Sequence, residues 1–183
     1  MKKDICFFVM AMLIACSNVN AMEFTLITKG GYVTFAAGDN WGVVTMETKK
    51  PNQTAAFQVP MSGEVDSAPP TNVSIILINP KLPETANALD SIGRSYGPSK
   101  VTEGTYNKWS TYRQVSNDSD GILFTIVDAK REIADVVVWV RFAWPKNKNN
   151  EAEPIFYNFL NSIRGDFGKY KTRDGEIIRR PIN

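Results

Sequence analysis

The stretch IADVVVWVRFAW, residues 133–144, does more than any other part of the sequence to decide the fold. One face of this stretch, as a strand, carries every second residue: Val136, Val138, Val140, Phe142 and Trp144. The other face carries Val137, Trp139 and Ala143, with Arg141 as its one charged member. A strand that is apolar on both faces is covered on both faces, so we expect this strand inside a sheet. Residues 72–79 predict a second central strand by the same pattern.

After residue 144 the apolar spacing changes from that of a strand to that of a helix. Residues 151–164 place five apolar side chains on one helical stripe: Ile155, Phe156, Phe159, Leu160 and Ile163. Pro154 falls in the first turn of this predicted helix, where proline is tolerated. The stripe is the strongest amphipathic signal in the chain, and it predicts a helix docked on the sheet.

The remaining periodicity predicts a single α+β domain over residues 22–164, with an antiparallel sheet and helices packed on it. Further strands are expected at residues 31–35, 41–48, 54–59, 106–115 and 122–128, and a second helix at residues 83–96. The charged segment 130–132 is interpreted as the turn before the strand at 133–144. The polar tail, residues 165–183, is either a terminal hairpin or a frayed end.

The first 21 residues have the layout of a secretory signal peptide. Lys2 and Lys3 precede an apolar run at residues 5–15, and a tail of small polar residues ends at Ala21. The run is too short for a membrane span, which takes about 20 residues. Cleavage before Met22 gives a soluble periplasmic protein, and we favour it. Residues 13–16 also match a bacterial lipobox, which would lipidate Cys16 and anchor the protein to the outer membrane, facing the periplasm.

Composition excludes most catalytic chemistry from the exported chain. Both cysteines, Cys6 and Cys16, lie inside the signal region, and the chain has no histidine. No Ser-His-Asp or Cys-His site can be built, and zinc, copper and haem sites lack their usual ligands. We therefore expect no enzyme, cofactor or metal. Chemistry that needs only carboxylates stays open: a pair of acids acting on glycans, or a calcium or magnesium site. Without residues 1–21 the charge is nearly balanced, which argues against nucleic acid and, unless Cys16 is lipidated, against membrane binding.

Two sets of residues are candidates for binding a protein partner. Trp109 and Tyr112 lie with Tyr106 in the predicted strand 106–115, although Trp109 would face away from both tyrosines. The tail adds a basic set that could dock an acidic partner or anionic lipid headgroups, although a solubilising tail is the favoured interpretation: Lys169, Lys171, Arg173, Arg179 and Arg180. The acids Asp128, Glu132 and Asp135 could pair at one turn, but a solvated hairpin tip is the favoured interpretation.

The order of these elements resembles the PsbP/DcrB-like family, whose members are α-β-α sandwiches. The resemblance covers about residues 31–164 and rests on Tyr32-Val33-Thr34-Phe35, on Asn40-Trp41, on the strand at residues 75–78 and on the helix ending at residues 156–163. Family members are mostly accessory subunits, envelope lipoproteins and secretion-associated chaperones. The resemblance therefore implies binding without catalysis, and it transfers no active-site residue.

Three functions follow from these observations. The first is an exported bacterial envelope protein that binds another envelope protein without catalysing a reaction. The second is an immunity protein that neutralises a secreted, periplasmic toxin, for which a toxin gene next to this one is the discriminating observation. The third, which we rank last, is a carboxylate-based glycan hydrolase, which needs two acids about 5–10 Å apart in a cleft.

Overall fold

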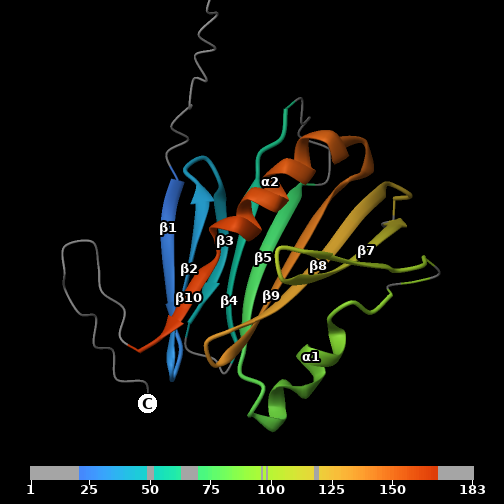
Figure 1. Cartoon of the computed structure of the whole chain (residues 1–183). Coiled ribbons are helices and arrows are strands. Elements are labelled where there is room, and N and C mark those ends of the chain that lie inside the picture. The colour runs from blue at the N-terminus through green and yellow to red at the C-terminus, as the bar shows by residue number, and fades with distance from the viewer. Residues whose placement is uncertain are drawn as a thin grey trace, which may run out of the picture.

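The expected strand at residues 133–144 forms β9 (Val136–Pro145), which lies inside a seven-stranded antiparallel sheet (Figure 1). The computed structural model describes residues 21–48, 52–62, 70–95, 97, 99–117 and 120–168. The large sheet has the strand order β3-β4-β5-β9-β8-β7-β6. Its other strands are β3 (Gly42–Glu47), β4 (Gln53–Val59), β5 (Thr71–Ile78), β6 (Thr102–Tyr106), β7 (Trp109–Asn117) and β8 (Leu123–Ile133).

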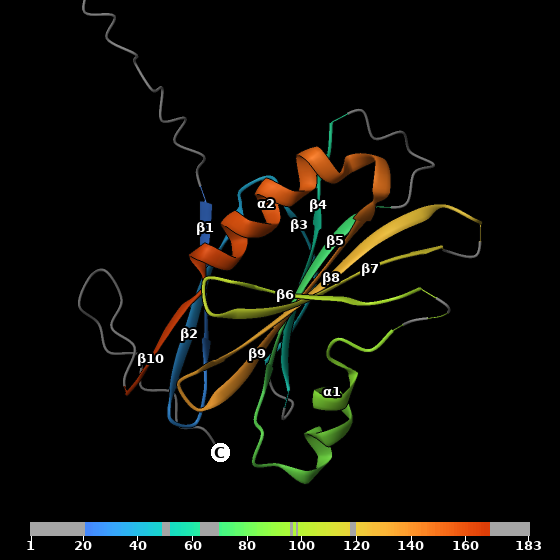
Figure 2. The same cartoon turned by 45° about the vertical axis from the view of Figure 1, so that its right-hand side comes forward.

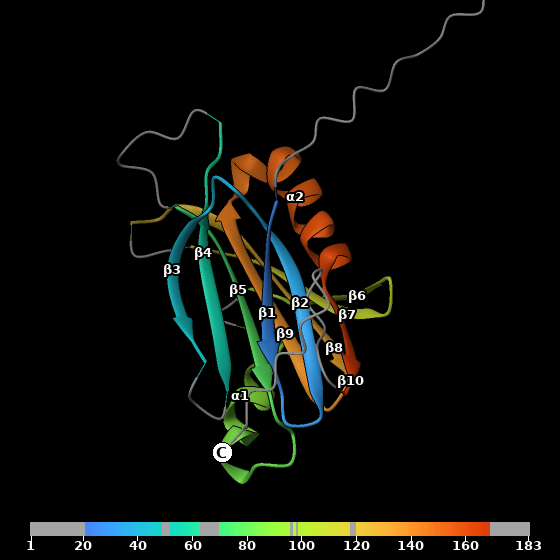
Figure 3. The ribbon, with the colours of Figure 1, turned by 90° about the vertical axis from the view of Figure 1, so that its left-hand side faces the viewer.

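A smaller sheet and one long helix form a second layer over one face of the large sheet (Figure 3). The smaller sheet has the order β1-β2-β10, with β1 (Ala21–Ile27), β2 (Gly31–Gly38) and β10 (Arg164–Phe167). The long helix is α2 (Asn149–Ser162), preceded by the 3-10 turn η2 (Lys146–Lys148). The second helical segment consists of η1 (Pro83–Thr85) and α1 (Ala86–Ser91). The chain is thus one α+β domain, as the sequence predicts.

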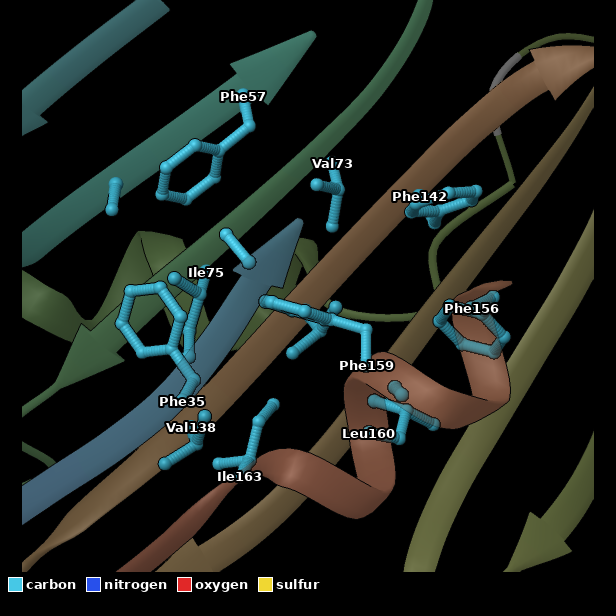
Figure 4. Packing of buried hydrophobic residues seen from close by; sticks show 14 of the residues in the cluster. Phe35, Phe57, Val73, Ile75, Val138, Phe142, Phe156, Phe159, Leu160 and Ile163 are labelled. Atoms are coloured by element: carbon cyan, nitrogen blue, oxygen red, sulfur yellow. The ribbon is translucent and has the colours of Figure 1, made fainter. Parts of the chain in front are cut away.

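The core lies between the large sheet and the second layer. The face of β9 that starts at Val136 is buried along its whole length, as its alternation predicts. Phe156 and Phe159 project from α2 into this layer, where the Phe156 ring lies 5.6 Å from Phe142 (Figure 4). The Phe159 ring contacts Phe35 of β2 at 5.8 Å, so the helix and the smaller sheet share one core. The predicted helix at residues 151–164 is confirmed, starting two residues earlier.

The opposite face of the large sheet is covered less than the sequence predicts. Along β5, Asn72 is exposed and Ser74 and Ile76 are only partly buried. The expected helix at residues 83–96 is shorter, because α1 ends at Ser91 and Gly93 adopts φ +73°. No residue of α1 is buried, so this helix covers little of the sheet. Tyr96 lies outside the described residues.

Two turns differ from the sequence prediction. The strand expected at residues 106–115 is a hairpin, because Asn107 and Lys108 both adopt positive φ and reverse the chain between β6 and β7. The predicted turn at residues 130–132 lies instead within β8, which continues to Ile133. The chain reverses at Ala134 and Asp135, where Ile133 pairs with Val136. The structure also adds β1, which the sequence did not predict. The start of the tail, for which the sequence allows a hairpin or a frayed end, forms β10 and pairs with β2.

Ala134 occupies a backbone conformation that suits glycine better. Its φ of +54° puts an L-residue in the left-handed region, at a cost of about 1–2 kcal/mol. Ala134→Gly is expected to raise the free energy of unfolding by about 0.5–1 kcal/mol, since glycine avoids this strain but gains entropy in the unfolded chain. Urea denaturation of both proteins measures the difference, and a loss of stability would contradict it.

The start of α2 is tied to the chain that leaves β4. The backbone N–H and the hydroxyl of Ser62 donate to the two carboxylate oxygens of Glu151, each at 2.7 Å. These hydrogen bonds, the backbone one first, hold the pKa of Glu151 below its ordinary value of 4.5, with a smaller contribution from Lys148. The carboxylate form of Glu151 is therefore favoured by folding.

Glu151→Gln is expected to make stability less dependent on pH below about 5. Because the folded pKa is depressed, the stability that ionised Glu151 adds is present above the unfolded pKa and is lost as pH falls through the folded pKa. The free energies of unfolding of the wild type and of Glu151→Gln, measured by urea denaturation, should therefore differ at pH 7 and converge near pH 3. Glu84→Gln, at an exposed position, is the control. A difference that stays constant from pH 7 to pH 3 would contradict this account.

Candidate functional site

The β6–β7 hairpin lies beside α2 (Figure 2). Residues of the hairpin and of α2 line a cavity of about 140 Å³. Its wall on the sheet side comes from β6 and β7, and its wall on the helix side comes from α2. Ten residues line it: Thr102, Glu103, Gly104, Thr111, Arg113, Val127, Trp144, Glu153, Phe156 and Tyr157. We refer to this cavity and the adjoining edge of β6 as the hairpin groove.

The floor of the hairpin groove is apolar and rigid. Trp144 and Phe156 are buried, and their rings lie 6.2 Å apart. Trp144 is fixed from beneath, because its indole Nε1 donates to Asn149 Oδ1 at 2.7 Å. The same Asn149 oxygen accepts the Thr125 hydroxyl at 2.8 Å. Both hydrogen bonds tie the floor to the first turn of α2, so it is preformed.

An ion pair joins the two walls of the groove. The Arg113 guanidinium on β7 donates to the Glu153 carboxylate on α2 at 2.5 Å, and both side chains are about one third exposed. The guanidinium also lies over the Trp144 ring, 5.8 Å from its centroid. The Arg113 guanidinium therefore packs its face on the floor and directs its edge to the rim. A partly exposed ion pair contributes little free energy, so Arg113 can exchange Glu153 for another acceptor with a small free-energy cost.

A second contact holds the tip of the hairpin against α2. The Tyr106 and Tyr157 rings lie 4.4 Å apart, and the Asn161 side-chain amide donates to the Tyr106 hydroxyl at 2.8 Å. Asn107, in the hairpin turn, donates to Asn161 Oδ1 at 2.9 Å. The hairpin is thus fixed to the helix at its tip and at Arg113, and the cavity lies between these two points.

The outer side of the groove is an unpaired strand edge. In the described part of the chain, β6 pairs with β7 on one side and with no strand on the other. Residues 102–105 are all exposed. Thr102 and Gly104 face the cavity, since they pair with Arg113 and Thr111. A Cβ at Gly104 would meet one neighbouring atom, the Thr111 hydroxyl oxygen, at a tight 3.1 Å, so this hydroxyl would have to shift slightly to admit a side chain.

The opposite face of the sheet carries a buried charged cluster. Asp128 accepts hydrogen bonds from Arg141 Nε and Nη2, both at 2.8 Å, and from Trp139 Nε1 at 2.9 Å. The Arg141 guanidinium also lies 5.0 Å from the Trp139 ring centroid. The carboxylate is saturated by donors, so the cluster is structural.

The acids considered together in the sequence do not form one site. Asp128 lies within β8, whereas Asp135 lies in the turn and bonds Thr28 and the Gly30 N–H of the β1–β2 turn. Glu132 is exposed between them. Among the described residues, no group of three or more Asp, Glu, His or Cys side chains could hold a metal ion.

The sequence-predicted binding residues are divided by the structure. Trp109 is only 1 % exposed, so it belongs to the core and does not form a binding surface. It pairs across the hairpin with Tyr106, so these two share a face, and the expectation that they face apart is wrong. Tyr112 is half-buried on the other face, next to Gly93 and under Lys130. Cys16 and the basic tail set, Lys169, Lys171, Arg173, Arg179 and Arg180, lie outside the described residues.

Comparison with known proteins does not identify this chain. No family model matches it, and no curated protein is significantly similar. One similar solved structure is the Ran-binding protein Mog1p of Saccharomyces cerevisiae, with 11 % identity, a TM-score of 0.46, and coverage of 80 % of this chain and 95 % of that one. Another is LpqN of Mycobacterium tuberculosis, described as involved in cell envelope biogenesis, with 12 % identity, a TM-score of 0.43, and coverage of 80 % and 91 %. At these values the similarity carries no argument about function, and PsbP/DcrB-like membership stays a prediction.

The helices of the described part of the chain are all too short or too polar to cross a membrane. The sequence missed Arg113, Glu153 and Gly104 as site residues. Arg113 and Glu153 are 40 positions apart, and only the packing of α2 against the hairpin joins them. Gly104 carries the one local signal, since a glycine inside a strand often marks a close approach by another group.

Proposed function

We propose that this chain is an exported bacterial envelope protein that binds a protein partner through the hairpin groove and catalyses no reaction. The observation that carries the proposal is the preformed apolar floor beside an exposed strand edge. Protein–protein interfaces commonly have an apolar centre and a polar rim, and an exposed strand edge beside a pocket is a recurrent peptide-binding arrangement. The lack of histidine, together with cysteines confined to the signal region, supports binding in place of catalysis.

The location belongs to the same proposal. Cleavage before Met22 places the protein in the periplasm, and lipidation of Cys16 anchors it to the outer membrane. The intact mass of protein purified from the envelope, with and without Cys16→Ala, distinguishes these two forms. The partner is either an envelope protein or a secreted toxin. If the partner is a toxin, this chain is an immunity protein, and a toxin gene next to its own gene would support that function.

Site-specific photo-crosslinking in living cells tests the binding site. A benzophenone amino acid is placed at Thr102, which faces the cavity, and separately at Thr45 on the far edge strand β3; both positions are exposed. We expect one discrete adduct from Thr102, identified by mass spectrometry as the same protein in repeated experiments, and none from Thr45. Equal adducts from both positions, or none from either, would contradict the proposal.

A further inference from the structure

We infer that the partner binds as an extended segment that adds a strand to β6 and inserts one apolar side chain into the hairpin groove. This inference rests on the proposed function and states the chemistry of the partner. Strand addition requires an exposed edge for the main-chain hydrogen bonds and a pocket for alternate side chains. The hairpin groove has both: β6 is unpaired on its outer side within the described chain, and the cavity opens on the face of Thr102 and Gly104.

The size of the cavity selects the side chain. A cavity of about 150 Å³ in a protein core is large enough for benzene. The hairpin groove, at about 140 Å³, therefore accommodates one leucine, methionine or phenylalanine side chain and not a larger ligand. In an extended segment, the residues directly before and after this anchor point to the opposite face. The cavity therefore receives a single anchor side chain.

The charge at the rim selects the neighbours of the anchor. Three charged residues line the cavity, and the two acids Glu103 and Glu153 outnumber Arg113. One negative charge thus remains after the Arg113–Glu153 pair is counted. A segment with lysine or arginine close to the apolar anchor complements this rim, whereas an acidic segment is repelled.

The other edge of the sheet fits this role less well. Strand β3 exposes Val43, Val44 and Met46, but its register shifts between Val43 and Thr45. A bulge of this kind disrupts pairing along an edge, which proteins use to prevent strand addition. The cavity also lies at the β6 end of the sheet, so the two requirements meet only there.

Peptide titration followed by nuclear magnetic resonance tests the inference on the mature protein, purified from the envelope of cells that express the full chain. The probe is the acetylated and amidated peptide Thr-Lys-Val-Leu-Val-Lys-Thr, in which both lysines share the face of the leucine anchor, and its control has aspartate in place of leucine. We expect saturable shifts of the backbone amides of residues 102–106 and of the Trp144 indole, at least tenfold weaker with the aspartate peptide.

Two variants locate the binding. Gly104→Leu fills the cavity and should lower the affinity for the leucine peptide at least tenfold. Thr105→Leu lies on the other face of β6 and should change this affinity less than twofold. Shifts centred on β3, equal binding of both peptides, or no saturable shift at 5 mM peptide would overturn the inference. If Thr102 forms its adduct in cells but the leucine peptide does not bind, only the strand-addition mode is overturned. If neither the adduct nor peptide binding is observed, the proposed function is overturned as well.

Discussion

Replacing Phe156 by alanine should lower the free energy of unfolding by about 3–5 kcal/mol. Phe156 is 1 % exposed. The centroid of its ring lies 5.6 Å from that of Phe142 and 6.2 Å from that of Trp144. Truncation removes the buried ring and leaves a cavity next to the floor of the hairpin groove. The surrounding rings cannot collapse into it, because Trp144 is held by Asn149.

Phe167→Ala is the matched control for this prediction. Phe167 is 66 % exposed at the end of β10, so the same substitution should change stability by less than about 0.5 kcal/mol. Urea denaturation of both variants gives their free energies of unfolding. The values are compared with the m-value, the slope of this free energy against urea concentration, held at that of the wild type. Equal losses from the two variants would mean that α2 is not docked as described.

Asp128→Ala should have the second large effect, a loss of about 3–5 kcal/mol in the free energy of unfolding. The Asp128 side chain is 4 % exposed, and its removal takes away the carboxylate that accepts hydrogen bonds from Arg141 and from the Trp139 N–H. Since the Arg141 side chain is 27 % exposed, water can replace part of the lost interaction. We therefore expect a value near the lower end of this range.

Asp90→Ala is the control for the buried pair. Asp90 on α1 and Arg94, three residues beyond its end, form an ion pair at 3.3 Å with side chains 67 % and 65 % exposed, and its loss should cost less than about 0.5 kcal/mol. Asp128→Asn, which keeps an acceptor for Trp139 but removes the charge, should fall between the two. Similar stability of Asp128→Ala and Asp90→Ala would contradict the structural role of the cluster.

The parts of the fold that the sequence predicted are those with a long local pattern. Alternation along residues 133–144 and the helical stripe at residues 151–164 placed β9 and α2, because burial of one face is enforced over many residues. The β6–β7 hairpin was missed, since Asn107-Lys108 lacks the glycine that marks most two-residue turns. Tight turns depend on one or two backbone angles, which apolar periodicity does not report.

The strand β10 and the hairpin groove depend on contacts between distant segments. Strand β10 has four residues and pairs with β2, where a Cβ on Gly165 would meet the Tyr32 carbonyl at 2.5 Å. The need for glycine there becomes visible only once the two strands are side by side. The groove likewise joins β6, β7 and α2, so neither its floor nor its ion pair has a signal in any one segment.

Binding through the hairpin groove is tested by the affinity of the crosslinked partner for three forms of the protein. Isothermal titration compares the wild type with Gly104→Leu, which fills the hairpin groove, and with Thr105→Leu, which alters the opposite face of the same strand. We expect at least a tenfold loss of affinity for Gly104→Leu and less than a twofold change for Thr105→Leu. Unchanged affinity of Gly104→Leu, with its fold intact, would contradict binding through the hairpin groove.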